Sequence, residues 1–298
     1  MSDPRFAVVG IRPPEPAPPR KQTRYAGMPV LSLCVLGLLL LGCLLCGVFL
    51  PGDPAHMDLT RCNAAPGGDS WFGTDAMGRD VFAMLWYGGR VSLTIGFASA
   101  AVSAAIAIAV GAVSGLAPRW LDGLIMRLTE LVLSIPGLLL VVLLQAILGK
   151  ATVWSLSLVI GAAGWTAMAK VVRTEVRQLR CSGYMTAARC MGGGFFHNLR
   201  RHLAPNFFPS ILFMVVMNIR SAMVTESTLS FMGMGLPLEV VSWGSMLSLS
   251  EKALLSGAWW VILFPGVFLI TTLLCVTNIG NFLRESSGRK QSNLRIRK

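Results

Sequence analysis

The chain has 298 residues, of which 54% are hydrophobic and only 13% charged, and its formal net charge is +12. Its apolar residues form long continuous runs near 28–50, 92–117, 124–149, 153–172, 206–233 and 257–280. A bilayer core requires roughly 20 apolar residues per helix, so these runs predict an all-α integral membrane protein with about six transmembrane helices. This composition excludes an ordinary water-soluble domain.

The basic residues indicate how the chain lies in the membrane. They cluster in the first 27 residues, between 170 and 201, and after 284, and with six spans these clusters fall on one side. The positive-inside rule therefore predicts cytosolic N- and C-termini and a cytosolic 184–205 segment. Because the charge follows orientation and contact with lipid, it does not indicate a nucleic-acid partner.

Three regions follow from this pattern. Residues 1–27 are predicted to form a flexible, proline-rich cytosolic tail, residues 28–285 the transmembrane domain, and residues 286–298 a basic cytosolic tail. The 184–205 segment is the main cytosolic insertion in the transmembrane domain.

The first segment expected outside the membrane contains three charges bracketed by glycines, Asp75, Arg79 and Asp80. We expect them to form a local charge cluster that holds the loop; solvated loop charges are the alternative. Asp80 is predicted to cap a helix over residues 81–87 that rests on the membrane surface before the chain re-enters near Ser92.

Two transmembrane runs carry unusual residues. Pro136 interrupts the third run and is predicted to kink it, either as a hinge or as a static bend. In the fifth run, Asn218, Ser221 and Thr225 share one helix face, and polar residues within a membrane usually face a cavity or a partner helix. This face is predicted to line a translocation path, or alternatively to form helix–helix hydrogen bonds.

Two charges flank that face. Arg220 points away from it and is expected to meet another subunit or to reach the interface. Glu226 lies near the outer end of the same run, and we include it among the path residues, with simple access to water as the alternative.

Catalytic chemistry is missing from the sequence. Its three histidines, His56, His197 and His202, do not fall on one side of the membrane, and no metal-ligand spacing occurs. Residues 149–152 resemble the end of a phosphate loop, but Leu144 occupies the position of the required upstream glycine. We expect no catalytic residue, no metal site and no ATP binding in this chain.

The 184–205 segment has a distinct layout. The small residues Thr186, Ala187 and Ala188 begin a helix, Arg189 follows, and Gly192, Gly193 and Gly194 interrupt it. A second, basic helix is expected over 195–203, and Pro205 begins the next span. Two short helices at an angle are thus predicted, with an ordinary connecting loop as the alternative.

At these residues the chain resembles the permease subunits of binding-protein-dependent ABC importers. Their cytosolic pattern has Glu-Ala-Ala, a glycine four residues later, and a proline after a further interval. Ala187, Ala188, Gly192 and Pro205 match it, whereas Thr186 replaces the glutamate and His202 and Ala204 depart from its end.

Further motifs are similar to the dipeptide/oligopeptide/nickel group, specifically its C-type subunit. They include Phe72-Gly-Thr-Asp75, Gly78-Arg-Asp80, Ser134-Ile-Pro136, the stretch from Glu226 to Gly235, and Ser242-Trp243-Gly244. The resemblance covers roughly residues 55–285. It places Asp75, Arg79, Asp80 and Trp243 on the outer side, which receives the binding protein.

The resemblance implies a type I ABC importer permease in the cell inner membrane, a transport subunit rather than an enzyme. Its implied partners are a homologous second permease, two ATP-binding subunits that hold ATP and Mg²⁺, and a solute-binding protein that delivers di- or oligopeptides. Alternatives left open are nickel or a metal–chelator complex as cargo, and a membrane scaffold or signalling subunit.

Overall fold

The computed structural model describes residues 29–50, 53–54, 56–68, 70–180, 204–237 and 239–296. Most of the 184–205 segment, including Thr186, Ala187, Ala188, Arg189, Gly192, Gly193 and Gly194, lies outside these residues, as does the 1–27 tail. Apart from isolated bridges that join Gly67 to Ser70 and Thr74 to Asp80, the regular structure of the described ranges is helical. The all-α prediction is therefore confirmed.

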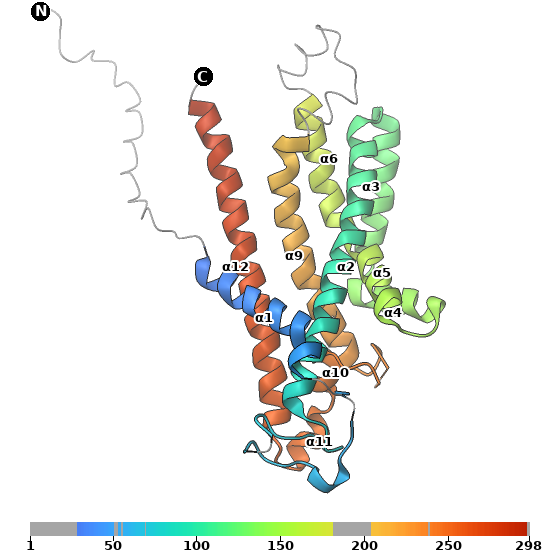
Figure 1. Cartoon of the computed structure of the whole chain (residues 1–298). Helices are drawn as coiled ribbons and strands as arrows, with labels where there is room; N and C mark the ends of the chain where they lie inside the picture. The colour runs from blue at the N-terminus through green and yellow to red at the C-terminus, as the bar shows by residue number, and fades with distance from the viewer. Residues whose placement is uncertain are drawn as a thin grey trace, which may run out of the picture.

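The helices follow the predicted runs (Figure 1). In chain order they are α1 (Val30–Phe49), the short 3-10 helix η2 (Leu59–Arg61), α2 (Val81–Leu116), α3 (Arg119–Ser134), α4 (Gly137–Leu148), α5 (Val153–Gly164), α6 (Thr166–Arg180), α9 (Ala204–Phe231), α10 (Trp243–Ser248), α11 (Ser250–Leu255) and α12 (Trp260–Ile296). Pro205 is the second residue of α9, within the first turn, where a proline is tolerated. α12 continues to Ile296, so most of the predicted C-terminal tail is helical.

Helix α2 corrects one prediction. Asp80 caps it as expected, since its carboxylate accepts a hydrogen bond from the Phe82 amide at 2.9 Å. The helix then runs without a break for 36 residues, so the short surface helix expected before Ser92 is wrong. Gly89 lies inside it, where a Cβ atom would stand 2.5 Å from Cys43 Sγ and 2.6 Å from the Trp243 ring. The absence of a side chain there lets α1 and α10 pack closely against α2.

Two helices are broken. α3 and α4 meet at 92° across Ile135 and Pro136, and α5 and α6 meet at 50° at Trp165. Ile135 has an extended backbone (ψ 128°), the conformation that a following proline favours. The kink predicted at Pro136 is thus confirmed and is a complete interruption of the helix, whereas the break at Trp165 was not predicted.

By length and composition, three described helices could each cross a membrane: α1, α2 and residues 260–285 of α12. Counting each bent pair as one span raises the number to five. α9 covers the run predicted at 206–233 but is not among them. The predicted count of about six spans and the cytosolic orientation of the termini stay predictions.

Helix α2 lies at the centre of the packing, in contact with α1, α5, α6 and α9. Three apolar clusters surround it: one toward α1, α10 and α12, one toward α4 and α5, and one toward α6. α9 contributes to each of them. The described residues of the 53–80 range and helices α10 and α11 lie together at one end of the bundle, which we call the loop end (Figure 1).

Candidate functional site

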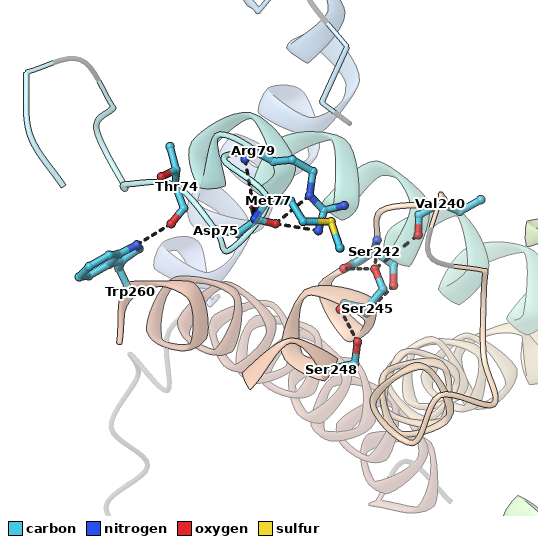
Figure 2. A network of polar contacts seen from close by, with 9 residues as sticks. All are labelled: Thr74, Asp75, Met77, Arg79, Val240, Ser242, Ser245, Ser248 and Trp260. Atoms are coloured by element: carbon cyan, nitrogen blue, oxygen red, sulfur yellow. Dashed lines mark hydrogen bonds and ion pairs between the residues drawn. The ribbon is translucent and has the colours of Figure 1, made fainter. Parts of the chain in front are cut away.

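A buried ion pair organises the loop end. Arg79 Nε and Nη2 each lie 2.7 Å from Asp75 Oδ2, and Asp75 Oδ1 accepts hydrogen bonds from the Met77 and Arg79 amides at 2.9 Å (Figure 2). Both side chains are buried, and a buried charge is tolerated when it is paired and hydrogen-bonded. The charge cluster predicted for these two residues is confirmed, and the alternative of solvated charges is wrong for them. Asp80 is exposed and serves as the cap of α2.

Aromatic side chains fix this loop to the helices. The Trp260 indole N–H donates to the Thr74 carbonyl at 3.0 Å (Figure 2), and the stacked rings of Phe72 and Phe264 have centroids 4.0 Å apart. Trp243, the first residue of α10, is fully buried, and its indole N–H donates to the Leu85 carbonyl of α2 at 2.9 Å. The loop end is therefore tied to α2, α10 and α12.

Three of the four residues assigned to the binding-protein side are buried in this chain. Asp75, Arg79 and Trp243 have exposed fractions of 1%, 6% and 0% in this chain. Their side chains hold the loop end together and do not form its surface. Contact with a binding protein stays a prediction, and it would involve the exposed residues that surround them.

Next to this loop, a carboxylate is enclosed by hydroxyl groups. Glu226 of α9 is fully buried; its Oε1 accepts hydrogen bonds from Ser230 (3.0 Å) and Ser242 (2.7 Å), and its Oε2 from Ser92 (3.1 Å) and Ser227 (3.3 Å). We call these five residues the Glu226 cluster. The ion pairs of the described ranges do not include Glu226. The alternative that Glu226 simply reaches water is wrong for this chain, and its assignment to a path stays a prediction.

The cluster connects three elements. Ser92 lies on α2, Ser227 and Ser230 lie on α9, and Ser242 is the N-cap of α10. Hydroxyl donors replace the hydration that the carboxylate loses on burial. A displacement of α10 relative to α9 would therefore break hydrogen bonds to a buried carboxylate.

The start of α10 is fixed by serines as well (Figure 2). Ser242 Oγ accepts from the Ser245 amide at 3.0 Å, and Ser245 Oγ accepts from the Ser242 amide at 2.8 Å, which makes a reciprocal capping box. Ser248 Oγ donates to the Ser245 carbonyl at 2.7 Å. Ser242 therefore caps α10 and binds Glu226 with one hydroxyl group.

The other residues predicted to line a path lie in different surroundings. Asn218 Nδ2 donates to Ser103 Oγ of α2 at 2.5 Å, so the alternative of helix–helix hydrogen bonding holds for Asn218. Ser221 and the neighbouring Arg220 are exposed on the surface of the chain. Thr225 is half-buried, and its hydroxyl donates to the Ser221 carbonyl at 2.9 Å. Their role in a path stays a prediction.

Two cavities whose linings include polar side chains open near these groups. One, of about 710 Å³, lies between the α4–α5 turn and the α9–α10 connection; its lining includes Lys150, Ser230, Glu239 and Ser245. The other, of about 450 Å³, lies at the loop end and includes Asp58. Hydrogen bonds from the hydroxyl group and then the amide of Thr60 hold the pKa of Asp58 below its usual range. Among the described residues, no group of three or more His, Cys, Asp or Glu side chains could hold a metal ion.

Sequence reasoning overlooked the partners of Glu226. Ser92 and Ser242 are small polar residues far from it along the chain, and serine is common in helices of any kind. The available signal was Glu226 itself, because an acidic residue in an apolar run requires donors from neighbouring helices. The presence of Glu226 indicates that such donors exist, but it does not identify the residues that supply them.

The structure is that of a multi-pass helical membrane protein. It has long apolar helices, two of them broken, and a buried carboxylate and a buried ion pair lie beside a loop that is held tightly to the helices. The family model described as "binding-protein-dependent transport system inner membrane component" matches residues 107–287. The chain belongs to this family of ABC importer permease subunits, which are transport components of the inner membrane and not enzymes.

Individual relatives match over most of their length. A protein of Brucella suis named as a peptide permease is 36% identical over 240 residues, which are 80% of this chain and 79% of the relative. The dipeptide transport system permease protein DppC of Bacillus subtilis is 34% identical, with coverage of 79% and 73%. The oligopeptide transport system permease protein OppC of the same organism is 33% identical, with coverage of 78% and 76%.

Proposed function

We propose that this chain is the C-type permease subunit of an ATP-driven importer of di- and oligopeptides. The observation that carries the proposal is the similarity to permeases named for peptides, dipeptides and oligopeptides at 33–36% identity over about four fifths of the chain. None of the relatives reported above is named for nickel, so peptides are the proposed cargo.

The proposed assembly contains a homologous second permease, two ATP-binding subunits that hold ATP and Mg²⁺, and a solute-binding protein. The loop end is proposed to face the binding protein, and the 184–205 segment to contact the ATP-binding subunits in the cytosol. We propose that helix α9 borders the path, because it carries the polar residues Asn218, Ser221, Thr225 and Glu226. The exposed Arg220 and Ser221 support this, because membrane-embedded polar residues that this chain leaves uncovered favour contact with a second subunit or an aqueous path.

Uptake by the purified complex tests the proposal. The permease pair, the ATP-binding subunits and the binding protein are reconstituted in vesicles, and a panel of labelled di- to hexapeptides is offered with and without ATP. We expect ATP-dependent uptake of peptides. Excess nickel or a nickel–chelator complex should not reduce this uptake. Uptake of nickel in any form, with no peptide accumulating, would show that the cargo is wrong, and absence of the ATP-binding subunits from the purified complex would favour a scaffold.

A further inference from the structure

At the end of the bundle opposite the loop end, one carboxylate joins three helices. Asp122 of α3 has an exposed fraction of 5%. It accepts hydrogen bonds from Ser114 Oγ of α2 at 2.6 Å, from Arg173 Nε and Nη2 of α6 at 2.5 and 2.6 Å, and from Arg177 Nη1 of α6 at 3.0 Å. We call Ser114, Asp122, Arg173 and Arg177 the Asp122 cluster. The two bonds to Arg173 have the forked geometry that guanidinium groups form with carboxylates, which fixes orientation as well as distance.

A third arginine extends this attachment. Arg180, the last residue of α6, donates from Nη1 to the Leu116 carbonyl at the end of α2, at 3.0 Å. Arg173, Arg177 and Arg180 are spaced four and three residues apart, so they lie along one face of α6. α6 is therefore attached to the α2–α3 turn over its last two helical turns.

Close packing reinforces the same unit. A Cβ atom on Gly115 of α2 would stand 2.8 Å from Val176 Cγ1 of α6, so the two helices approach at the distance that only a glycine allows. The end of α2, the start of α3 and the second half of α6 thus share apolar contact, a buried carboxylate and three arginines.

Beyond this unit both α3 and α6 are interrupted. α3 is joined to α4 through the 92° bend at Pro136, and α6 is joined to α5 through the 50° bend at Trp165. α4 and α5 pack against each other, with Val141, Leu156 and Val159 in one apolar cluster. The unit formed by the end of α2, α3 and α6 is therefore joined to the α4–α5 pair by two bends of the chain, and α5 also packs directly against α2.

We propose that Asp122 is a positioning residue for coupling: through Arg173 and Arg177 it makes α3 move together with α6, and the two helices carry the α4–α5 pair with them. The proposal rests on the proposed function, because α6 ends at Arg180, four residues before the 184–205 segment begins. Without the cluster, a displacement of α6 would not reach α3, and ATP hydrolysis would proceed with less transport.

The first test compares Asp122→Asn with a matched control on the same helix, Arg127→Gln. Arg127 is 84% exposed and pairs only loosely with Glu130, at 3.6 Å. In the reconstituted complex, we expect Asp122→Asn to assemble normally but to raise the ATP hydrolysed per peptide imported by about fivefold or more, the lower end of typical coupling effects. Arg127→Gln should match the unsubstituted protein. The exchanged pair Asp122→Arg with Arg173→Asp keeps the same charges and should restore most of the ratio.

A second readout needs no peptide. Ile147 of α4 is 73% exposed, so Ile147→Cys, in a chain whose seven native cysteines are replaced, reports the position of the α4–α5 pair through its rate of alkylation. Addition of a non-hydrolysable ATP analogue should change this rate in the reporter protein and in Arg127→Gln, but not in Asp122→Asn. This readout holds even if the cargo proves not to be a peptide.

Three results would overturn the proposal. One is an unchanged ATP-to-peptide ratio in Asp122→Asn. Another is a lower melting temperature and a smaller amount of assembled complex for Asp122→Asn, while the ATP-to-peptide ratio is unchanged and the exchanged pair gives no rescue. That combination would mean that Asp122 has a purely structural role. The third is an alkylation rate at Ile147→Cys that does not change with nucleotide in the reporter protein that keeps Asp122.

Discussion

Glu226 shows how a single buried residue can connect the helices of a permease. Its two carboxylate oxygens each accept hydrogen bonds from two serine hydroxyl groups, and the donors come from α2, α9 and the cap of α10. Hydrogen bonds to a carboxylate are stronger than those between neutral groups, and removal of the acceptor leaves buried donors unsatisfied. The cluster therefore stabilises the contact between α9 and α10.

We predict that Glu226→Ala lowers the stability of the purified complex by about 1–3 kcal/mol, the cost of leaving buried polar groups unpaired. Glu226→Gln should cost less, because it keeps one carbonyl oxygen for Ser230 or Ser242, and the other hydroxyls can turn to accept from its amide. Thermal unfolding in detergent measures the stabilities of the two variants relative to the unsubstituted complex. Glu130→Gln, at a 52% exposed position of α3, is the control and should have no measurable effect. Equal melting temperatures for Glu226→Ala and the control would contradict the role of the cluster.

Among the helices, the contact of α2 with α6 depends on a glycine. A Cβ atom on Gly111 would stand 2.7 Å from the Ala169 carbonyl oxygen and 2.7 Å from Val172 Cβ, whereas one on Gly123 of α3 meets nothing within 4 Å. Both glycines are inside helices, where alanine is the better helix former by about 1 kcal/mol. The two sites therefore differ in packing and not in backbone propensity.

Gly111→Ala and Gly123→Ala should consequently act in opposite directions. We predict that the first destabilises the complex by about 1–3 kcal/mol through overpacking. The second should be neutral or stabilising by up to about 1 kcal/mol. Melting temperatures and the yield of assembled complex measure both. A loss of stability in both variants would mean that close packing of α2 on α6 is not what distinguishes the two glycines.

Local patterns explain which of these features could be predicted from the sequence. The cap at Asp80, the bend at Pro136 and the pairing of Asp75 with Arg79 each depend on residues within a few positions of one another. Contacts across long separations were not predictable: Ser92 and Glu226 are 134 residues apart, and Arg173 and Asp122 are 51 apart. The unbroken course of α2 was missed for the same reason, because Gly89, which follows the expected short helix, packs against Trp243 and Cys43, and only the fold brings these two residues near it.

For the whole molecule, the basic clusters predict an orientation that native cysteines can test. Cys62 is exposed at the loop end, and Cys181 and Cys190 precede α9 in the region predicted to be cytosolic. In variants that retain one cysteine, a membrane-impermeant maleimide should label Cys62 in right-side-out vesicles and Cys190 in inverted ones. Labelling of Cys62 from the inverted side would reverse the proposed topology, and permeabilised vesicles, in which both should react, serve as the control.

Coupling across the membrane is expected to depend on the 184–205 segment. If this segment contacts the ATP-binding subunits, arrival of the loaded binding protein at the loop end must change the free energy of the ATP-bound state by as much as ATP binding changes the affinity for the binding protein. Substitutions in the segment should weaken both effects together and leave assembly largely intact.

Gly192→Pro removes backbone freedom at the predicted turn, and Arg189→Glu reverses a charge beside it. For both we expect continued ATP hydrolysis that no longer responds to the loaded binding protein, with uptake reduced by about fivefold or more. Arg295→Glu, the same charge change in the C-terminal region, is the control and should retain the response. The measurement is ATPase activity with and without peptide-loaded binding protein, at equal amounts of complex. Normal uptake by both variants would mean that the ATP-binding subunits act on this permease elsewhere. The replacement of the usual glutamate by Thr186 would then be the first difference to test as the cause.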